Sequence, residues 1–254
     1  MPACLVTGAA RRIGAGITET LANAGWTVVA HYGGSDDEAE KLAARLAEEG
    51  ARAMPLKADL ANDAEIMGLV PQATEMAGEP LSLLVNNASD FSEDHLGTLD
   101  PANWDHHMAV NLKAPALLSQ AFAAQVPEAT RGLIVNLLDQ KLWNLNPDFF
   151  SYTISKIGLR GVTEMMAKAL APQVRVCGIA PGITLPSTHQ SQEHFEKAHT
   201  QNPLQHGATI EDITRTLMFL IDSPAISGQT ILVDSGQHFG GDTRDVLYTD
   251  FSGD

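Results

Sequence analysis

Apolar runs of strand length alternate along the chain with longer segments whose apolar residues recur at helical spacing. The strand segments, such as LIVNLL at 133–138, are mostly apolar throughout, which is typical of strands buried on both faces. The runs predict strands near 3–7, 26–31, 52–57, 81–86, 132–138, 174–180 and 229–234. The segments between them predict helices near 13–24, 36–49, 62–77, 101–126, 150–171 and 209–222. This alternation predicts an α/β fold with a doubly wound, seven-stranded parallel sheet covered by helices on both faces.

Composition narrows the class of protein. The 254 residues fit a single domain with a large core, because 44% are hydrophobic. The formal net charge of −15 argues against nucleic acid or an anionic membrane as a partner, since both need basic patches. No apolar stretch reaches the ~20 residues that span a bilayer, and the first apolar run ends at Arg11 without the features of a signal peptide. We therefore expect a cytoplasmic protein in which Cys4 and Cys177 are free, buried thiols.

Two segments interrupt the alternation. Residues 182–207 are polar and follow a predicted strand, at the end where ligands bind in such sheets. They are either a lid over a substrate or an ordinary surface insertion. The tail after residue 234 carries Val246, Leu247, Tyr248 and Phe251, whose side chains need cover from a neighbouring subunit unless the terminus frays. The nine histidines lack the i, i+4 spacing of a helical ligand pair, and we expect no metal site.

The stretch CLVTGAARRIGAGIT predicts a glycine-rich turn between the first strand and helix. Gly8 permits the tight turn, and Gly14 lets a pyrophosphate approach the backbone at the N-terminus of the helix. Arg11, Arg12 and Ile13 lie in the same loop, where a cation is placed to bind phosphate or ligand.

The end of the second predicted strand indicates which nicotinamide cofactor is bound. NAD-binding sheets place a carboxylate there for the ribose hydroxyl, whereas this chain has His31 with Ser35 beyond it. With nothing there to repel a 2′-phosphate, and with two arginines nearby, we expect NADP(H).

Three residues suggest the chemistry. Tyr152 and Lys156 are four residues apart and share one face of a predicted helix, and Asp139 lies upstream of them. A nearby ammonium should lower the tyrosine pKa, which would make the phenol a usable proton donor near neutral pH.

Together, these motifs and LLVNNAS at 83–89 resemble the short-chain dehydrogenase/reductase family, whose fold is of the Rossmann type. The resemblance implies that Asn111 supports a water relay as a fourth catalytic residue. It also implies further cofactor contacts from Asp59, Leu60, Asn87, Ala88, Ser89, Tyr152, Lys156, Pro181 and Gly182.

Departures from the common family pattern point to the pteridine reductase branch. Arg12 replaces the middle glycine of the turn, Ser89 replaces a glycine, and Asp139 stands where a serine is usual. Phe91 matches the aromatic residue that stacks on the pterin ring in that branch. The implied substrate contacts are Arg12, Ser89, Phe91, Asp139 and Tyr152.

An ionised Asp139 only accepts hydrogen bonds, so it suits a substrate with N–H donors better than the oxyanion of a reduced carbonyl. The sequence therefore predicts an NADPH-dependent reductase that acts on a C=N bond of a pteridine such as a dihydropterin or dihydrofolate. Two alternatives stay open: a carbonyl reductase such as a 3-oxoacyl-thioester reductase, and a non-catalytic NADP(H)-binding regulator. By analogy with the family, we expect a homo-oligomer, a tetramer or a dimer.

Overall fold

The fold is built on one parallel sheet of seven strands, in the order β3-β2-β1-β4-β5-β6-β7. It is seen in a computed structural model that describes residues 1–187, 190–241 and 243–249. The strands are β1 (Ala3–Val6), β2 (Thr27–Tyr32), β3 (Arg52–Lys57), β4 (Leu81–Asn86), β5 (Gly132–Leu137), β6 (Val174–Pro181) and β7 (Thr230–Val233). The predicted fold class and all seven strands are confirmed, with ends that differ by one residue at most.

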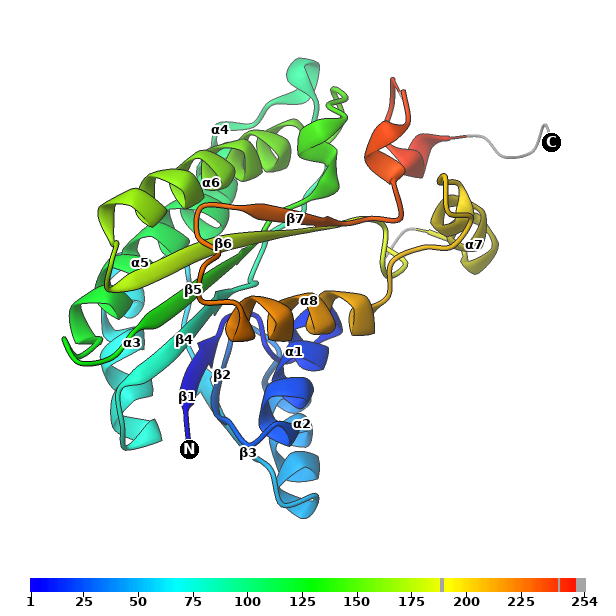
Figure 1. Cartoon of the computed structure of the whole chain (residues 1–254). Helices are drawn as coiled ribbons and strands as arrows, with labels where there is room; N and C mark the ends of the chain where they lie inside the picture. The colour runs from blue at the N-terminus through cyan, green and yellow to red at the C-terminus, as the bar shows by residue number, and fades with distance from the viewer. Residues whose placement is uncertain (188–189, 242, 250–254) are drawn as a thin grey trace.

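Helices cover both faces of the sheet (Figure 1). One face carries α1 (Arg12–Asn23), α2 (Asp36–Glu48) and α8 (Ile210–Asp222). The other carries α3 (Asp63–Ala77), α5 (Ala114–Gln125) and α6 (Phe150–Ala169). The remaining helices are α4 (Pro101–Met108) and α7 (Gln192–Thr200), with short helical turns η1 (Leu96–Thr98), η2 (Ala109–Lys113), η3 (Gln140–Trp143), η4 (Gln237–Phe239) and η5 (Val246–Tyr248).

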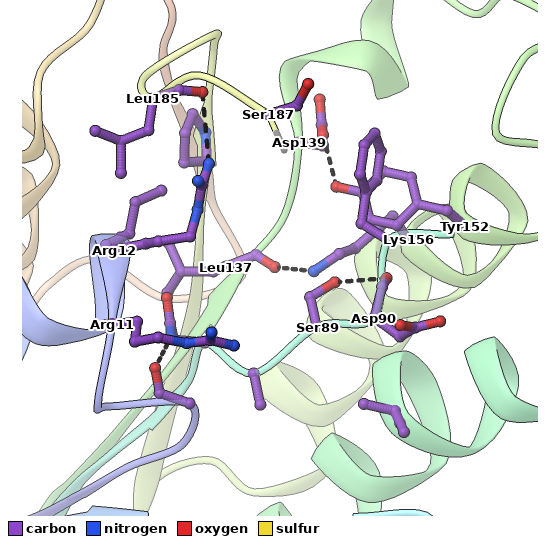
Figure 2. Close-up of a pocket in the computed structure, with 18 of the residues that line it drawn as sticks. Arg11, Arg12, Ser89, Asp90, Leu137, Asp139, Tyr152, Lys156, Leu185 and Ser187 are labelled. Atoms are coloured by element: carbon purple, nitrogen blue, oxygen red, sulfur yellow. Dashed lines mark hydrogen bonds between the residues drawn. The ribbon is translucent and has the colours of Figure 1, made fainter. Parts of the chain in front are cut away.

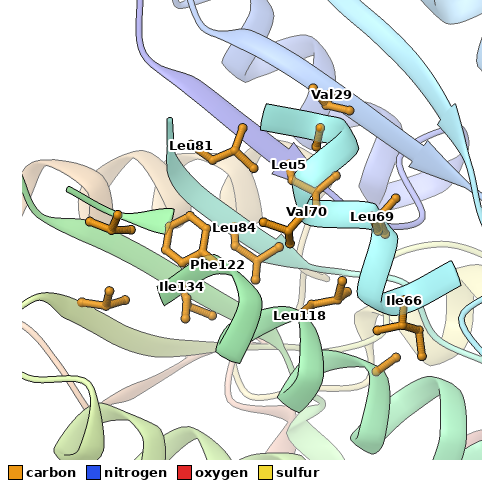
Figure 3. Packing of buried hydrophobic residues seen from close by; sticks show 14 of the residues in the cluster. Leu5, Val29, Ile66, Leu69, Val70, Leu81, Leu84, Leu118, Phe122 and Ile134 are labelled. Carbon is orange, nitrogen blue, oxygen red and sulfur yellow. The ribbon is translucent and has the colours of Figure 1, made fainter. Parts of the chain in front are cut away.

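The core lies in two layers because successive side chains of a strand point to opposite faces. In β1, Leu5 packs against α3 and α5, whereas Val6 packs against α1 and α8. Figure 3 shows the first layer, in which Phe122 of α5 lies near Leu84 of β4 and Ile134 of β5. Both layers are fully buried, which explains the continuous apolar runs of the strands.

One predicted helix is wrong in detail. The segment 101–126 is not continuous, because a π-type turn, η2, separates α4 from α5. Pro115 lacks the N–H that an α-helix would direct to the carbonyl of Asn111, and its ring crowds that carbonyl. The extra residue of the turn resolves this conflict and places Asn111 where the two helices meet.

The strand order reverses between β1 and β4, which are neighbours in the sheet although β2 and β3 lie between them in sequence. At such a point the loops beyond the two strands diverge and leave a crevice at their carboxyl ends. No helix in the described part of the chain is long and apolar enough to cross a membrane.

Candidate active site

A pocket of about 1460 Å³ opens beyond the carboxyl ends of the strands. It brings together residues that are far apart in sequence, with the two loop arginines on one wall and the catalytic candidates on the opposite wall (Figure 2). Every predicted site residue except Asn111 lines it. These residues are Gly8, Arg11, Arg12, Ile13, Gly14, His31, Ser35, Asp59, Leu60, Asn87, Ala88, Ser89, Phe91, Asp139, Tyr152, Lys156, Pro181 and Gly182.

The glycine-rich turn has the shape that a dinucleotide needs. Gly8 adopts a φ of +62°, which disfavours residues with a side chain. A Cβ at Gly14 would lie 2.0 Å from the Gly8 carbonyl oxygen, so only glycine fits there. The tight turn leaves the N-terminal end of α1 open to the pocket, where backbone N–H groups and the helix dipole favour a pyrophosphate.

Asn87 fixes this turn to the end of β4. Its side-chain amide donates to the carbonyls of Thr7 (2.9 Å) and Gly8 (3.0 Å). In return, the hydroxyl of Thr7 accepts from the backbone N–H groups of Asn87 and Ala88, each at 3.0 Å. Asn87 therefore shapes the cofactor site through the backbone.

His31 lies at the end of β2, as predicted. Its ring bonds to the backbone and carries no charge that could bind a phosphate. Its Nδ1 accepts from the N–H of Gly8 (3.2 Å), and its Nε2 lies 3.0 Å from the carbonyl of Ala58, to which it donates. Burial lowers the pKa of His31 to about 4, so the ring is neutral at pH 7. A neutral imidazole joins β2 to the glycine-rich turn and leaves the end of the strand without a negative charge.

The predicted cationic residues separate into two positions. Arg11 lies 4.0 Å from Glu38 near the start of α2, the helix that Ser35 precedes. Arg12, by contrast, donates to the carbonyls of Pro186 (2.8 Å) and Leu185 (3.4 Å), so it reaches the segment beyond β6 (Figure 2). Arg11 thus lies beside the start of α2, whereas Arg12 lies beside the segment that follows β6.

The catalytic candidates come together on the wall formed by β5 and α6. Asp94 accepts from the N–H of Ser151 (2.9 Å) and so caps the start of α6. Tyr152 and Lys156 follow one turn apart, and both side chains are buried. The hydroxyl of Tyr152 donates to Asp139 at 2.6 Å, and Lys156 donates to the carbonyl of Leu137 at 2.8 Å (Figure 2).

The electrostatics of this group differ from the sequence prediction. Burial, followed by the Asp139 carboxylate, raises the pKa of Tyr152 well above its usual range, where a lowered value was expected. The ammonium of Lys156 lies 5.8 Å from the Tyr152 ring centre, whereas Asp139 bonds to the hydroxyl directly. Burial also raises the pKa of Asp139 and lowers the pKa of Lys156 to about 8. Tyr152 is therefore held as a neutral phenol.

Asn111 is buried and its side chain is already engaged. Its Oδ1 accepts from the N–H of Asp90 (2.8 Å), while its Nδ2 donates to the carbonyl of Asp90 (2.9 Å) and to Ser155 (3.0 Å). The side chain therefore braces the loop after β4 against α6. The water relay implied for Asn111 stays a prediction.

Phe91 is 45% exposed and lines the pocket, which argues against an ordinary core residue. One face of its ring stacks on Phe149 with ring centres 4.2 Å apart, and its ring is nearly perpendicular to that of Tyr152, with ring centres 4.7 Å apart. Since Phe149 itself is buried and does not line the pocket, the exposed part of the Phe91 ring is what the pocket presents to a flat ligand.

Polar atoms without partners support a ligand in this space. Among the residues that the structure describes, the buried Oγ of Ser187 and Oε1 of Gln140 have no hydrogen-bond partner, and both residues line the pocket. Such groups are costly unless a ligand or water pairs with them. Within the same residues, no group of three or more His, Cys, Asp or Glu side chains could hold a metal ion.

Sequence reasoning missed part of the substrate end. Part of the tail docks on its own chain, where Arg244 bonds to Asp148 and Asp245 bonds to Lys141, so this part is not frayed. Cover from another subunit stays a prediction. The apolar run of the tail at 246–248 was the available signal, and Phe251 lies outside the described residues. The pocket-lining residues missed include Gln140, Lys141, Ser187, Arg244, Asp245, Val246 and Leu247.

Comparisons with known proteins agree with this geometry. The family model described as short chain dehydrogenase matches residues 2–197. The curated 3-oxoacyl-[acyl-carrier-protein] reductase FabG of Staphylococcus aureus is 31% identical over 239 residues, which cover 92% of this chain and 97% of that protein. Two crystal structures of FolM alternative dihydrofolate reductase 1 in complex with NADP, from Brucella canis and Brucella suis, are each 46% identical with a TM-score of 0.91. Each alignment covers 96% of this chain, together with 96% of the Brucella canis chain and 98% of the Brucella suis chain. The predicted family is confirmed: the chain belongs to the short-chain dehydrogenases.

Proposed function

We propose that the protein is an NADPH-dependent oxidoreductase that reduces a C=N bond of a pteridine, a dihydropterin or dihydrofolate. The observation that carries this proposal is the 2.6 Å hydrogen bond from Tyr152 to Asp139 beside the exposed ring of Phe91. It places a proton donor, an acceptor for N–H groups and an aromatic platform on one side of the pocket.

When bound, NADPH supplies a hydride to the ring carbon of the C=N bond. Tyr152 holds the proton that the ring nitrogen requires, because its raised pKa keeps the phenol protonated. Lys156 is anchored on the carbonyl of Leu137, and its ammonium lies 5.8 Å from the centre of the Tyr152 ring. It supports the negative charge that remains on the Tyr152–Asp139 pair once the proton has left.

Asp139 selects the substrate class. An ionised carboxylate accepts the N–H donors of an aminopyrimidine edge, whereas it repels the oxyanion that develops when a carbonyl is reduced. The Tyr152 hydroxyl uses one carboxylate oxygen and the N–H of Lys141 lies 2.8 Å from the other. Each oxygen keeps a further lone pair for the substrate.

The Brucella relatives support both the cofactor and the substrate class. At 46% identity over 96% of the chain, they are named alternative dihydrofolate reductases and their crystals hold NADP. Within this chain, the neutral His31 and the position of Arg11 favour the phosphorylated cofactor. The carboxylate of Asp36 beside them is paired with Lys57 at 2.7 Å, which offsets its charge.

The roles of the other site residues belong to the same proposal. The turn residues Gly8, Ile13 and Gly14 approach the pyrophosphate, and Ser35 and Arg11 meet the 2′-phosphate. Asp59 and Leu60 flank the adenine, and Pro181 and Gly182 cover the nicotinamide. Ser89 and Arg12 contact both cofactor and substrate, and Asn111 supports the relay to Lys156.

Residues 182–207 act as a lid in this account. Arg12 ties the segment to the glycine-rich turn through the carbonyls of Leu185 and Pro186, so the cofactor loop and the lid are linked directly. Thr188 and His189, inside this segment, lie outside the described residues. We place the enzyme in the cytoplasm as a homo-oligomer, a tetramer or a dimer.

One other function has specific support. FabG of Staphylococcus aureus is 31% identical, which favours a 3-oxoacyl-thioester reductase as the second candidate. Against it stands Asp139, which presents a carboxylate to the oxygen of the substrate. A non-catalytic NADP(H)-binding regulator is disfavoured, because it would not need Tyr152 and Lys156 buried together beside the pocket.

The test is the oxidation of NADPH by the purified protein with a panel of dihydropterins, dihydrofolate and an acetoacetyl thioester. We expect turnover with at least one pteridine and its loss in Tyr152→Phe, which serves as the matched inactive control. A protein that reduces only the oxo-thioester would refute the pteridine assignment. A protein that binds NADPH but reduces nothing in the panel would favour the regulator.

A further inference from the structure

The C-terminal segment closes the substrate end of the pocket. Arg244, Asp245, Val246 and Leu247 all line it, beyond the carboxyl end of β7 (Figure 1). Asp245 starts the short turn η5 because its side chain accepts from the N–H of Leu247 at 3.2 Å. Part of the wall that faces the substrate therefore comes from the last described residues of the chain.

This segment is anchored beside the catalytic group by buried charges. The ammonium of Lys141, two residues after Asp139, donates to Asp245 at 2.9 Å and to the carbonyl of Asp148 at 2.8 Å. In turn, the carboxylate of Asp148 accepts from Arg244 at 2.8 Å and from the N–H of Asp245 at 2.7 Å. The Lys141 side chain is only 6% exposed. Its buried ammonium would therefore lose its carboxylate partner, Asp245, if the C-terminal segment undocked.

A row of aromatic rings then runs from the segment to the substrate platform. Tyr248 stacks on Phe149 with ring centres 6.2 Å apart, and Phe149 stacks on Phe91 at 4.2 Å. Phe149 is buried and has a φ of +50°, a backbone conformation rare for a phenylalanine. Neighbouring side chains must hold Phe149 in this backbone conformation, and the ring of Tyr248 is one of them.

Tyr248 also lies near the loop that carries Phe91. Burial, followed by the carboxylate of Glu93, two residues beyond Phe91, raises the pKa of Tyr248. The phenol therefore stays protonated throughout the neutral range. The ring of Tyr248 contacts Phe149, which in turn supports the ring of Phe91.

We propose that Tyr248 is a positioning residue for substrate binding, which holds Phe91, through Phe149, in the plane that a flat heterocycle stacks against. The inference rests on the proposed function only for the identity of that heterocycle. Tyr248 does not line the pocket, so its effect passes through Phe91 and is confined to the substrate end. The cofactor cleft, at the other end, is independent of it.

The test compares three variants. Tyr248→Ala removes the ring and the hydroxyl, and Tyr248→Phe removes the hydroxyl alone. Phe239→Ala is the matched control, because Phe239 is an aromatic residue of the same tail that is 76% exposed and does not line the pocket. Thermal unfolding of each variant establishes that it is folded.

Tyr248→Ala should raise the KM for the dihydropterin about two- to tenfold, the range expected for loss of one aromatic pair. Its kcat and its Kd for NADPH should stay within about twofold of wild type. Tyr248→Phe should recover most of the loss, and Phe239→Ala should match wild type. An unchanged KM in Tyr248→Ala, or an equal weakening of NADPH binding, would overturn the proposal.

A second measurement separates this inference from the proposed function. Hydrogen exchange of the ligand-free protein should be faster in residues 90–95 of Tyr248→Ala than of wild type or Phe239→Ala. If the wild type reduces no pteridine, the proposed function fails, and the exchange result alone decides whether Tyr248 holds the Phe91 loop. Unchanged exchange in that segment would contradict the positioning role whatever the substrate is.

Discussion

Tyr152 and Asp139 form a short hydrogen bond of 2.6 Å between a buried phenol and a half-buried carboxyl group, both of which titrate. Burial raises the pKa of each, and the negative charge of Asp139 raises the pKa of Tyr152 further. In the ligand-free site the phenol therefore keeps its proton and donates a hydrogen bond to Asp139. This is the opposite of a tyrosine prepared as a phenolate by Lys156 alone.

The first prediction concerns this proton. Asp139→Asn should lower the pKa of Tyr152 from its wild-type value, because the carboxylate is the second cause of the shift, while burial keeps it above the ordinary range. The ultraviolet absorbance of tyrosinate measures it. The protein has three tyrosines, so the Tyr152→Phe variant identifies the signal. An unchanged or higher pKa in Asp139→Asn would contradict the assigned coupling.

The second prediction identifies the proton donor. Tyr152→Phe should lower kcat for the best pteridine by ~10²–10⁴-fold, the usual contribution of positioned proton transfer. NADPH binding, followed by cofactor fluorescence, should stay close to wild type because the ring is retained. If the variant keeps more than about a tenth of wild-type kcat, then the proton comes from another source, such as water.

The third prediction concerns cofactor preference. Arg11→Ala should lower kcat/KM with NADPH about tenfold. A charge-assisted hydrogen bond contributes ~1.5–3 kcal/mol, and the lower end of that range applies because Arg11 is largely exposed. The value with NADH should hardly change, since NADH lacks the 2′-phosphate. Arg52→Ala serves as the control, being an exposed arginine that does not line the pocket. Equal losses with both cofactors would show that Arg11 does not recognise the phosphate.

The fourth prediction follows from His31. Its pKa falls from 6.5 to about 4 in the folded protein because the 2%-exposed ring is desolvated. A lowered histidine pKa stabilises the fold above pH 6.5, and that contribution is lost as the pH falls from 6.5 towards 4. Between pH 7 and pH 5, wild type should therefore lose about 2 kcal/mol more unfolding free energy than His31→Gln. Urea unfolding at the two values measures this, and parallel losses would contradict a buried neutral His31.

Short-range patterns predicted most of the fold and the cofactor cleft. The apolar runs of β1 to β7 located the sheet, and residues such as Gly8 and Gly14 located the turn. These features are readable because the strands are buried on both faces and the glycines are required by local backbone geometry. The predicted helix at 101–126 has nearly the right bounds, but its π-type turn was missed, because Pro115 conflicts with a carbonyl four residues before it.

The substrate end depends on contacts between distant parts of the chain. The segment from Gln140 to Phe149 has no clear periodicity, because its conformation is set by partners about 100 residues away, as in the pair Lys141–Asp245. The conformation of Phe149 likewise depends on Phe91 and Tyr248. For the same reason the pKa of Tyr152 was predicted with the wrong sign: Lys156 was visible in the sequence spacing, but the direct bond to Asp139 was not.

The central claim is that Asp139 adapts a short-chain dehydrogenase to a pteridine. The most direct test is the ratio of kcat/KM for a dihydropterin to kcat/KM for an acetoacetyl thioester, measured in wild type and in Asp139→Ser. We predict that the wild-type ratio favours the dihydropterin and falls roughly ten- to hundredfold in Asp139→Ser, the range of one lost charge-assisted hydrogen bond. A wild-type enzyme that is inactive with every pteridine and active on the oxo-thioester would contradict the account.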